Sequence, residues 1–152
     1  MKTFQSRFRV CAPLHEVVAF HRRAASMAAI TPPPVIVRIH EAPPELSEGA
    51  EMAFTLWLGP LPIRWRARIE AVDEHGFRDR QLSGPFGSWL HTHRFVPIAA
   101  TVTEVHDTIE LELAAHGPAR WIGAGMWLSL PLLFAYRRWR TRQLLNRHRN
   151  CR

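Results

Sequence analysis

The residues from 63 to 71 alternate apolar and charged side chains without a break. The odd positions are Ile63, Trp65, Ala67, Ile69 and Ala71, and the even positions are Arg64, Arg66, Arg68 and Glu70. Side chains of a strand point alternately to its two faces, whereas a helix repeats every 3.6 residues. The pattern therefore predicts a strand with one buried and one solvated face, which has to belong to a larger sheet.

Similar patterns predict six further strands and three helices. The strands are expected at residues 3–10, 35–40, 51–58, 77–83, 88–95 and 101–114, and the helices at 14–23, 24–29 and 127–148. Most strands follow one another with only short turns between them, such as Gly59-Pro60, so the sheet is antiparallel and the helices lie on one side of it. We predict a single α+β domain over residues 1–152, without internal repeats.

The net charge of +7 is unevenly distributed along the chain. Residues 1–116 contain 12 basic and all 13 acidic residues, whereas residues 117–152 contain eight arginines and no acid. We assign residues 141–152 as a basic tail and expect the chain after Arg140 to project from the body. Such a tail is either a solvated helix end, favoured by the helix dipole, or a contact for phosphate groups or an anionic membrane surface.

One motif is shared with a known group of proteins. Gly84-Pro85-Phe86 leads into a strand with Trp89, His91, His93 and Phe95 on one face, and a later strand reads Thr103-Glu104-Val105-His106-Asp107. With the element order, this resembles the START-like superfamily of Bet v 1-type helix-grip domains, also called SRPBCC or polyketide cyclase-like proteins. The resemblance implies seven curved antiparallel strands around a long C-terminal helix, two short helices after the first strand, and an elongated cavity. It carries over no catalytic residue.

His91 and His93 lie two residues apart in a predicted strand, so their imidazoles share a face. A His-x-His pair often binds metal, but residues 94–100 contain no carboxylate, and a third ligand could come only from a distant strand. We therefore expect no metal and no cofactor, and interpret the two histidines as cavity-wall groups that orient a ligand. An outer-face position or a local structural role is the alternative.

The resulting hypothesis is a protein that binds or carries a small apolar ligand, such as a lipid, an aromatic or a polyketide-like molecule. The expected ligand-binding residues lie on inward strand positions and on the final helix: Phe54, Leu56, Trp65, Ile69, Trp89, His91, His93, Trp127, Leu128 and Phe134. A cyclase or dehydratase that uses the same pocket is the first alternative. Proton transfer there could involve Asp79, His91, His93 or Asp107, and the sequence does not select among them. No pattern indicates a hydrolase triad, and a binding role is favoured over an enzyme.

A peripheral membrane protein is the second alternative. Residues 121–136 carry no charge and are followed at once by arginines, an arrangement that suits a membrane-interface anchor better than a span. The contact would use Arg137, Arg138, Arg140 and Arg142. A core helix gripped by the sheet accounts for the same apolar run and is favoured.

Nucleic acid is not an expected partner. The outward stripe of Arg64, Arg66 and Arg68 comes without aromatic residues that stack on bases, and carboxylates on neighbouring strands can pair with it. We expect a cytoplasmic protein, because the N-terminus reads as a polar strand and not as a signal peptide. Cys11 and Cys151 are expected to be free thiols in a reducing compartment.

Overall fold

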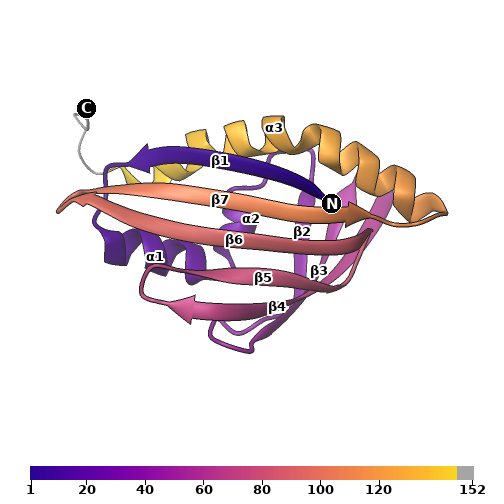
Figure 1. Cartoon of the computed structure of the whole chain (residues 1–152), viewed down its shortest axis with the longest axis horizontal. Coiled ribbons are helices and arrows are strands. Elements are labelled where there is room, and N and C mark those ends of the chain that lie inside the picture. The colour runs from indigo at the N-terminus through magenta and orange to yellow at the C-terminus, as the bar shows by residue number, and fades with distance from the viewer. Residues whose placement is uncertain (147–152) are drawn as a thin grey trace.

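The computed structural model describes residues 1–146 and shows a seven-stranded antiparallel sheet with helices on one side (Figure 1). In chain order the elements are β1 (Lys2–Val10), α1 (Leu14–Arg22), α2 (Ser26–Ala29), β2 (Ile36–Glu41), β3 (Glu51–Leu58), β4 (Leu61–Asp73), β5 (Gly76–Ser83), β6 (Phe86–Ala99), β7 (Val102–Leu113) and α3 (Pro118–Leu145). The strands lie in the order β1-β7-β6-β5-β4-β3-β2. The predicted α+β helix-grip fold, with two short helices after the first strand, is confirmed.

Strand β4 shows why the sheet has one apolar face. Its four alternating side chains from Ile63 to Ile69 are buried, and the three arginines between them are exposed. The alternation ends one residue earlier than predicted, because Ala71 is exposed and adopts a positive φ of 51° where the pairing with β5 shifts register. The carboxylate of Glu48 accepts hydrogen bonds from the backbone N–H groups of Ala71 and Val72, which holds this bulge in place.

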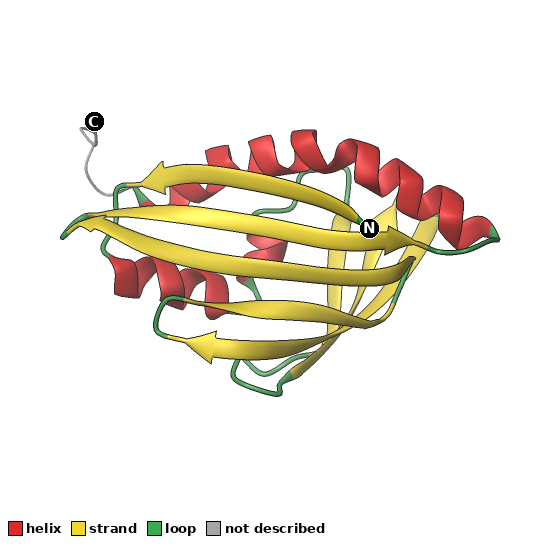
Figure 2. Ribbon diagram, viewed as in Figure 1, coloured by secondary structure: helices red, strands yellow, loops and turns green. Residues whose placement is uncertain are grey.

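Helix α3 covers only part of the inner face of the sheet. It packs against β1, β7 and β6, and α1 packs against β6 and β7 (Figure 2). Gly123 allows α3 to approach the sheet closely, since a Cβ atom there would lie 3.3 Å from the Phe86 ring and 3.2 Å from the Pro85 carbonyl oxygen. The inner faces of β3, β4 and β5 are therefore left to line a space between sheet and helix.

The final helix differs from the prediction at both of its ends. It begins at Pro118, nine residues before the predicted start, because a proline suits the first turn of a helix and the two glycines at 123 and 125 are tolerated within it. It ends at Leu145, whereas the prediction placed its end at residue 148. Residues 147–152 lie outside the described part of the chain.

The expectation that the chain projects after Arg140 is wrong for residues 141–146. Thr141 is fully buried, and Arg142 Nε donates a hydrogen bond to the backbone carbonyl of Arg9 at 3.0 Å. The side-chain oxygen of Asn146 accepts a hydrogen bond from the backbone N–H of Cys11 at 2.9 Å. These contacts fasten the end of α3 to the end of β1, so this stretch belongs to the body.

The expectation of a free thiol at Cys11 is also wrong, because Cys11 is disulfide-bonded. Cys151 is the other cysteine of the sequence, and it lies outside the described residues. Across residues 1–146, no helix is long and apolar enough to cross a membrane.

The outer face of the sheet carries paired charges. Arg66 and Arg68 both contact the carboxylate of Glu51 at 3.0 Å, and Arg80 contacts Glu70 at 3.0 Å. The arginine stripe of β4 is thus partly neutralised from the neighbouring strand β3, as cross-strand pairing predicts.

Candidate functional site

A cavity of about 770 Å³ lies between the inner face of the sheet and helix α3. Its walls come from β3, β4, β5 and β6, from α2 and the proline-rich segment after it, and from α3. Most wall residues are apolar, and the ring of Trp65 packs against those of Trp89 and Phe54, with centroids 5.2 and 5.9 Å away. The volume lies within the range of small-molecule sites in proteins.

Eight of the ten expected ligand-binding residues lie on the wall of this cavity. They are Phe54, Leu56, Trp65, Ile69, Trp89, His91, His93 and Phe134. The other two are not part of the wall, and their expected placement is wrong. Leu128 is 78% exposed on the outward side of α3, and the ring of Trp127 receives the Lys2 ammonium 5.3 Å from its centroid at the edge of the sheet.

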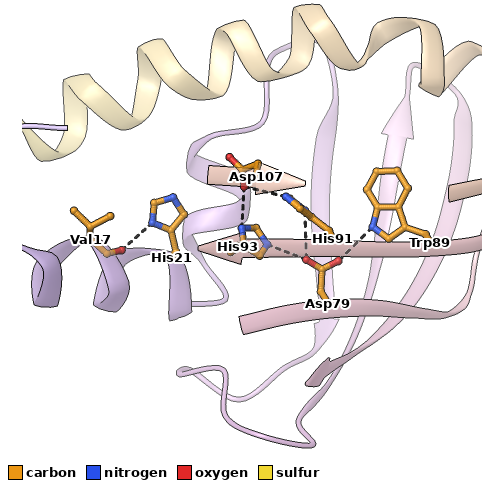
Figure 3. A network of polar contacts seen from close by, with 7 residues as sticks. All are labelled: Val17, His21, Asp79, Trp89, His91, His93 and Asp107. Carbon is orange, nitrogen blue, oxygen red and sulfur yellow. Dashed lines mark hydrogen bonds and ion pairs between the residues drawn. The ribbon is translucent and has the colours of Figure 1, made fainter. Parts of the chain in front are cut away.

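Four ionisable side chains meet at one wall of the cavity, and all four were acid–base candidates from the sequence. His91 and His93 extend from β6, with Asp79 opposite His91 on β5 and Asp107 opposite His93 on β7. Figure 3 shows the four converging, with Trp89 beside them. We call Asp79, His91, His93 and Asp107 the His–Asp cluster. It is the polar part of an otherwise apolar inner face.

The contacts within the His–Asp cluster are close. Nε2 of His91 donates to Oδ1 of Asp107 at 3.0 Å, and Nε2 of His93 donates to Oδ2 of Asp79 at 3.0 Å. The remaining ring nitrogens also face carboxylates: Nδ1 of His91 lies 3.4 Å from Asp79, and Nδ1 of His93 lies 3.1 Å from Asp107. The last contact lacks hydrogen-bond alignment, so His93 Nδ1 is buried without a hydrogen-bond partner among the described residues. Trp89 Nε1 donates to Asp79 at 3.4 Å.

This arrangement shifts the pKa of each member. Burial alone would raise the pKa of Asp107, but the hydrogen bonds from His91 and His93 hold it well below its usual range. Burial is likewise outweighed at Asp79, whose pKa is lowered by the charges of the two histidines and the hydrogen bond from His93. For His93, burial would lower the pKa, yet its contacts with Asp107 and Asp79 raise it to about 9. Burial, and then the charge of His93, lower the pKa of His91.

Other ionisable residues on the cavity wall include two that the sequence did not indicate as ligand-binding or catalytic residues. Arg137 turns inward from α3, with its guanidinium carbon 5.1 Å from the centroid of the Phe134 ring. Burial lowers its pKa, against the opposing effect of Asp107 and Asp79. Its Nε atom is buried and has no hydrogen-bond partner within residues 1–146. Arg137 is a half-buried residue that lines the cavity, and its predicted membrane contact stays a prediction.

The second group is His21 of α1. Its Nδ1 donates to the backbone carbonyl of Val17 at 2.8 Å, and its ring centroid lies 6.4 Å from that of His93 (Figure 3). Burial lowers the pKa of His21 to about 4. His21 is consequently neutral near pH 7, and Arg137 and His93 are the two cations that balance the two carboxylates.

The backbone of β5 fixes the position of His93. Gly76 passes so close to β6 that a Cβ atom at this position would lie 2.0 Å from the carbonyl oxygen of His93. On its other side, the His93 ring stacks on Phe77, with a centroid distance of 4.5 Å. Gly76 therefore lets the two strands pair closely at His93, and Phe77 packs against the imidazole.

Comparison of sequences finds no matching family model and no matching curated protein. Comparison of structures finds the same fold in several proteins. The aromatase/cyclase ZhuI from Streptomyces sp. R1128 superposes with a TM-score of 0.68 at 19% identity, over 94% of this chain and 95% of that one. Protein Ms6760 from Mycobacterium smegmatis gives 0.66 at 14% identity, covering 93% and 89%. Norcoclaurine synthase from Thalictrum flavum, solved with dopamine and hydroxybenzaldehyde, gives 0.63 at 16% identity, covering 90% and 83%.

These likenesses span nearly the whole chain. At such low identities they establish the architecture and leave the chemistry to the residues of this chain. The protein has the helix-grip fold, which it shares with these solved structures.

Proposed function

We propose that this protein binds a small apolar molecule in the cavity between the sheet and α3. The observation that carries the proposal is the cavity itself, about 770 Å³ in size and walled mainly by apolar side chains. Protein interiors are close-packed, and large voids in them are few. A hollow of this size, lined by aromatic and aliphatic groups, therefore favours a ligand over a structural role for these side chains.

The shape of the wall suggests what kind of molecule fits. Trp65, Phe54 and Ile69 offer flat and aliphatic surface, whereas Asp79, His93 and Arg137 bring charge to one side. A ligand with an apolar body and one oxygen-bearing end would use both parts, because buried polar groups need hydrogen-bonding partners. The names of two proteins with this fold, an aromatase/cyclase and norcoclaurine synthase, favour a ring-bearing molecule.

A neutral fluorescent probe, N-phenyl-1-naphthylamine, tests the proposal. We expect one probe per chain, with energy transfer from tryptophan, and a loss of affinity of at least tenfold on Ala67→Phe, which fills the cavity from β4. The matched control is Leu128→Phe, which adds a ring on the exposed side of α3 and should leave the affinity unchanged. Equal binding by both folded variants would contradict the proposal. Native mass spectrometry of freshly purified protein would show whether a small molecule is retained.

A second candidate function is catalysis in the same pocket, of the cyclase or dehydratase kind. The observation that favours it is the His–Asp cluster, because perturbed acids and bases at a cavity wall are typical of active sites. Incubation of a bound ligand with the protein distinguishes the two functions. A carrier returns the molecule unchanged, whereas a dehydratase releases a product lighter by one water, and His93→Gln should stop that conversion without abolishing binding.

A third candidate is docking on a membrane surface through α3. Trp121, Leu128 and Leu132 are each at least 77% exposed, and with Trp139 they follow a spacing of seven, four and seven residues that places them along one line of the helix. Residues 117–146 contain no acid, and Arg138 is exposed near this line, so the surface suits anionic lipid.

Vesicle co-sedimentation tests the docking of α3. We expect binding to vesicles with anionic lipid that weakens as salt rises and is lost in Leu128→Glu, with the outer-sheet variant Leu82→Glu as the control. Equal pelleting of both variants, or equal pelleting on neutral vesicles, would remove this candidate.

A further inference from the structure

The His–Asp cluster contains more nitrogen–oxygen contacts than its protons can fill. All four ring nitrogens of His91 and His93 lie within 3.4 Å of a carboxylate oxygen of Asp79 or Asp107 (Figure 3). Each contact needs an N–H to be favourable, because a bare nitrogen and a carboxylate oxygen both present lone pairs.

With both carboxylates ionised, the two rings cannot fill all four contacts with protons unless both rings are charged. A neutral imidazole carries one N–H and a charged one carries two, so one charged and one neutral ring provide three protons for four contacts. Four protons would require two imidazolium rings with centroids 3.8 Å apart, which repel each other strongly in a buried site. One nitrogen–carboxylate contact in the cluster therefore lacks its positive partner.

We propose that Asp79, His91 and His93 form a binding site for a divalent transition-metal ion, with Asp107 behind them as the carboxylate that orients both imidazoles. The ion would lie among Oδ2 of Asp79, Nδ1 of His91 and Nε2 of His93. Both rings are then neutral. His91 keeps its hydrogen bond from Nε2 to Oδ1 of Asp107, and Nδ1 of His93, which lies 3.1 Å from the same oxygen without hydrogen-bond alignment, would donate to it after a rotation of the ring. Metal-bound histidines commonly donate their other N–H to a carboxylate in this way.

The distances agree with coordination. An ion about 2.1 Å from each of two ligand atoms holds them about 3.0–3.4 Å apart at angles of about 90–109°. Asp79 Oδ2 lies 3.0 Å from His93 Nε2 and 3.4 Å from His91 Nδ1, so these two distances fit. One ligand atom from each of the three residues lies within 4.8 Å of the other two, and the two nitrogens have to lie within about 4.2 Å of each other when the ion binds. A small rotation of the two rings would complete the site.

The position of the site in the fold also fits. Asp79, His91 and His93 face the cavity, whereas Asp107 is not part of its wall. Three protein ligands on the cavity side leave coordination positions open toward the space where a ligand would bind, as in catalytic rather than structural metal sites. Two imidazoles and one carboxylate suit zinc or ferrous iron better than calcium or magnesium.

The charges that face the site set its preference for a further ligand. Arg137 and a divalent ion together bring three positive charges, and Asp79 and Asp107 supply two negative ones. An anionic oxygen on the bound molecule, such as a carboxylate or an enolate, would balance the remainder. This part rests on the proposed apolar-ligand function, whereas the metal site itself does not.

Calorimetric titration of untagged, chelator-treated protein with Zn²⁺ tests the site, and Co²⁺ absorption bands report on its ligands. We expect one equivalent of metal. His91→Ala and Asp79→Ala should each weaken binding at least 100-fold, and Asp107→Asn about 10- to 100-fold with the stoichiometry retained. The matched control is His106→Ala. His106 precedes Asp107 in the sequence but lies on the other face of β7, where it pairs with Glu104. Its removal should leave the affinity and stoichiometry of metal binding unchanged. Asp79→Asn, which keeps size and one oxygen, serves if Asp79→Ala does not fold.

A folded protein that takes up neither Zn²⁺ nor Co²⁺ would overturn the proposal, as would binding that His91→Ala leaves intact. The same chelator-treated sample is titrated with N-phenyl-1-naphthylamine. Probe binding without metal uptake refutes only the metal site, and metal uptake without probe binding refutes only the proposed ligand function.

Discussion

Both faces of the sheet carry charged side chains, but the two sets differ in nearly every physical respect. On the outer face, Arg80 and Glu70 meet at 3.0 Å while remaining in contact with water. On the inner face, His91 and Asp107 meet at the same distance with side chains that are 5% and 9% exposed. The pKa values of the inner histidines move in opposite directions, which nearby charge and burial together cause.

The two sets of charges differ in how they affect the free energy of folding. Exposed pairs add little to stability because water screens them, and they serve solubility and the pairing of strands. A buried set of charges costs desolvation, and an apolar replacement would often be as stable. The presence of two aspartates and two histidines beside an apolar cavity is therefore better explained by function than by stability.

The largest contrast is expected from removing one acid on each face. Asp107→Ala removes the more deeply buried of the two carboxylates that His91 and His93 contact, leaving them only Asp79, and should lower the free energy of unfolding by about 3–5 kcal/mol. Glu70→Ala on the outer face should change it by about 1 kcal/mol or less. Urea denaturation of the two variants measures both values, and equal losses would show that the inner cluster is already well hydrated.

Tryptophans on the two sides of the molecule give a similar contrast. Trp65→Ala removes a buried ring that contacts Phe54, Phe86 and Trp89, and we expect a loss of about 3 kcal/mol. Trp121→Ala, which removes a side chain that is 78% exposed on α3, should cost about 0.5 kcal/mol or less. A small loss for Trp65→Ala with weakened probe binding would identify its ring as cavity wall more than packed core.

The inner face should also make the stability of the protein depend on pH, through His93. The pKa of His93 rises from about 6.5 to about 9 on folding, so its contribution is complete below pH 6.5 and disappears as pH rises through 9. In chelator-treated protein this amounts to about 3 kcal/mol. His21 and His91, whose pKa values are lowered, are neutral when folded and take up protons only in the unfolded state, so their opposing effect fades above about pH 7.5. Urea denaturation between pH 6.5 and 9.5 should show the decline in the wild type and a flatter profile in His93→Gln.

The smallest effect is expected for the coupling of Arg80 and Glu70. A double-mutant cycle with alanine should give about 0.5 kcal/mol at low salt and less at 1 M salt, because the Debye length shortens. Coupling that persists at high salt would mean that the outer pair is better shielded from water than its exposure indicates.

The sheet could be predicted well because the alternation of apolar and polar side chains along a strand indicates directly which face is buried. The alternation of β4 and the shared face of His91 and His93 depend only on a period of two. This alternation does not indicate the register in which neighbouring strands pair. Asp79 and Asp107 join the histidines because β5 and β7 pair with β6 at particular residues, and both pairings follow from turns whose geometry the sequence leaves open.

Helix α3 was harder to predict because its first half is apolar on all sides. Leu128 and Phe134 are six residues apart and therefore differ by about 240° around the axis, so they cannot both face the sheet. Without a polar face to set the rotation, the sequence offers no reason to choose between them. The same uncertainty concealed Arg137, whose place in a run of arginines suggested the surface although its position on the helix directs it inward.

Gly76 has a consequence for how variant libraries of this protein would be interpreted. It has no side chain and takes part in no polar contact of the His–Asp cluster, yet the backbone of β6 leaves no room for even a methyl group there. In a systematic substitution screen, any replacement at this position would displace the carbonyl of His93 and register as a loss of function. Such a screen would place Gly76 in the same class as the residues of the His–Asp cluster. Only the structure shows that Gly76 contributes no functional group and is needed because the β6 backbone lies so close to it.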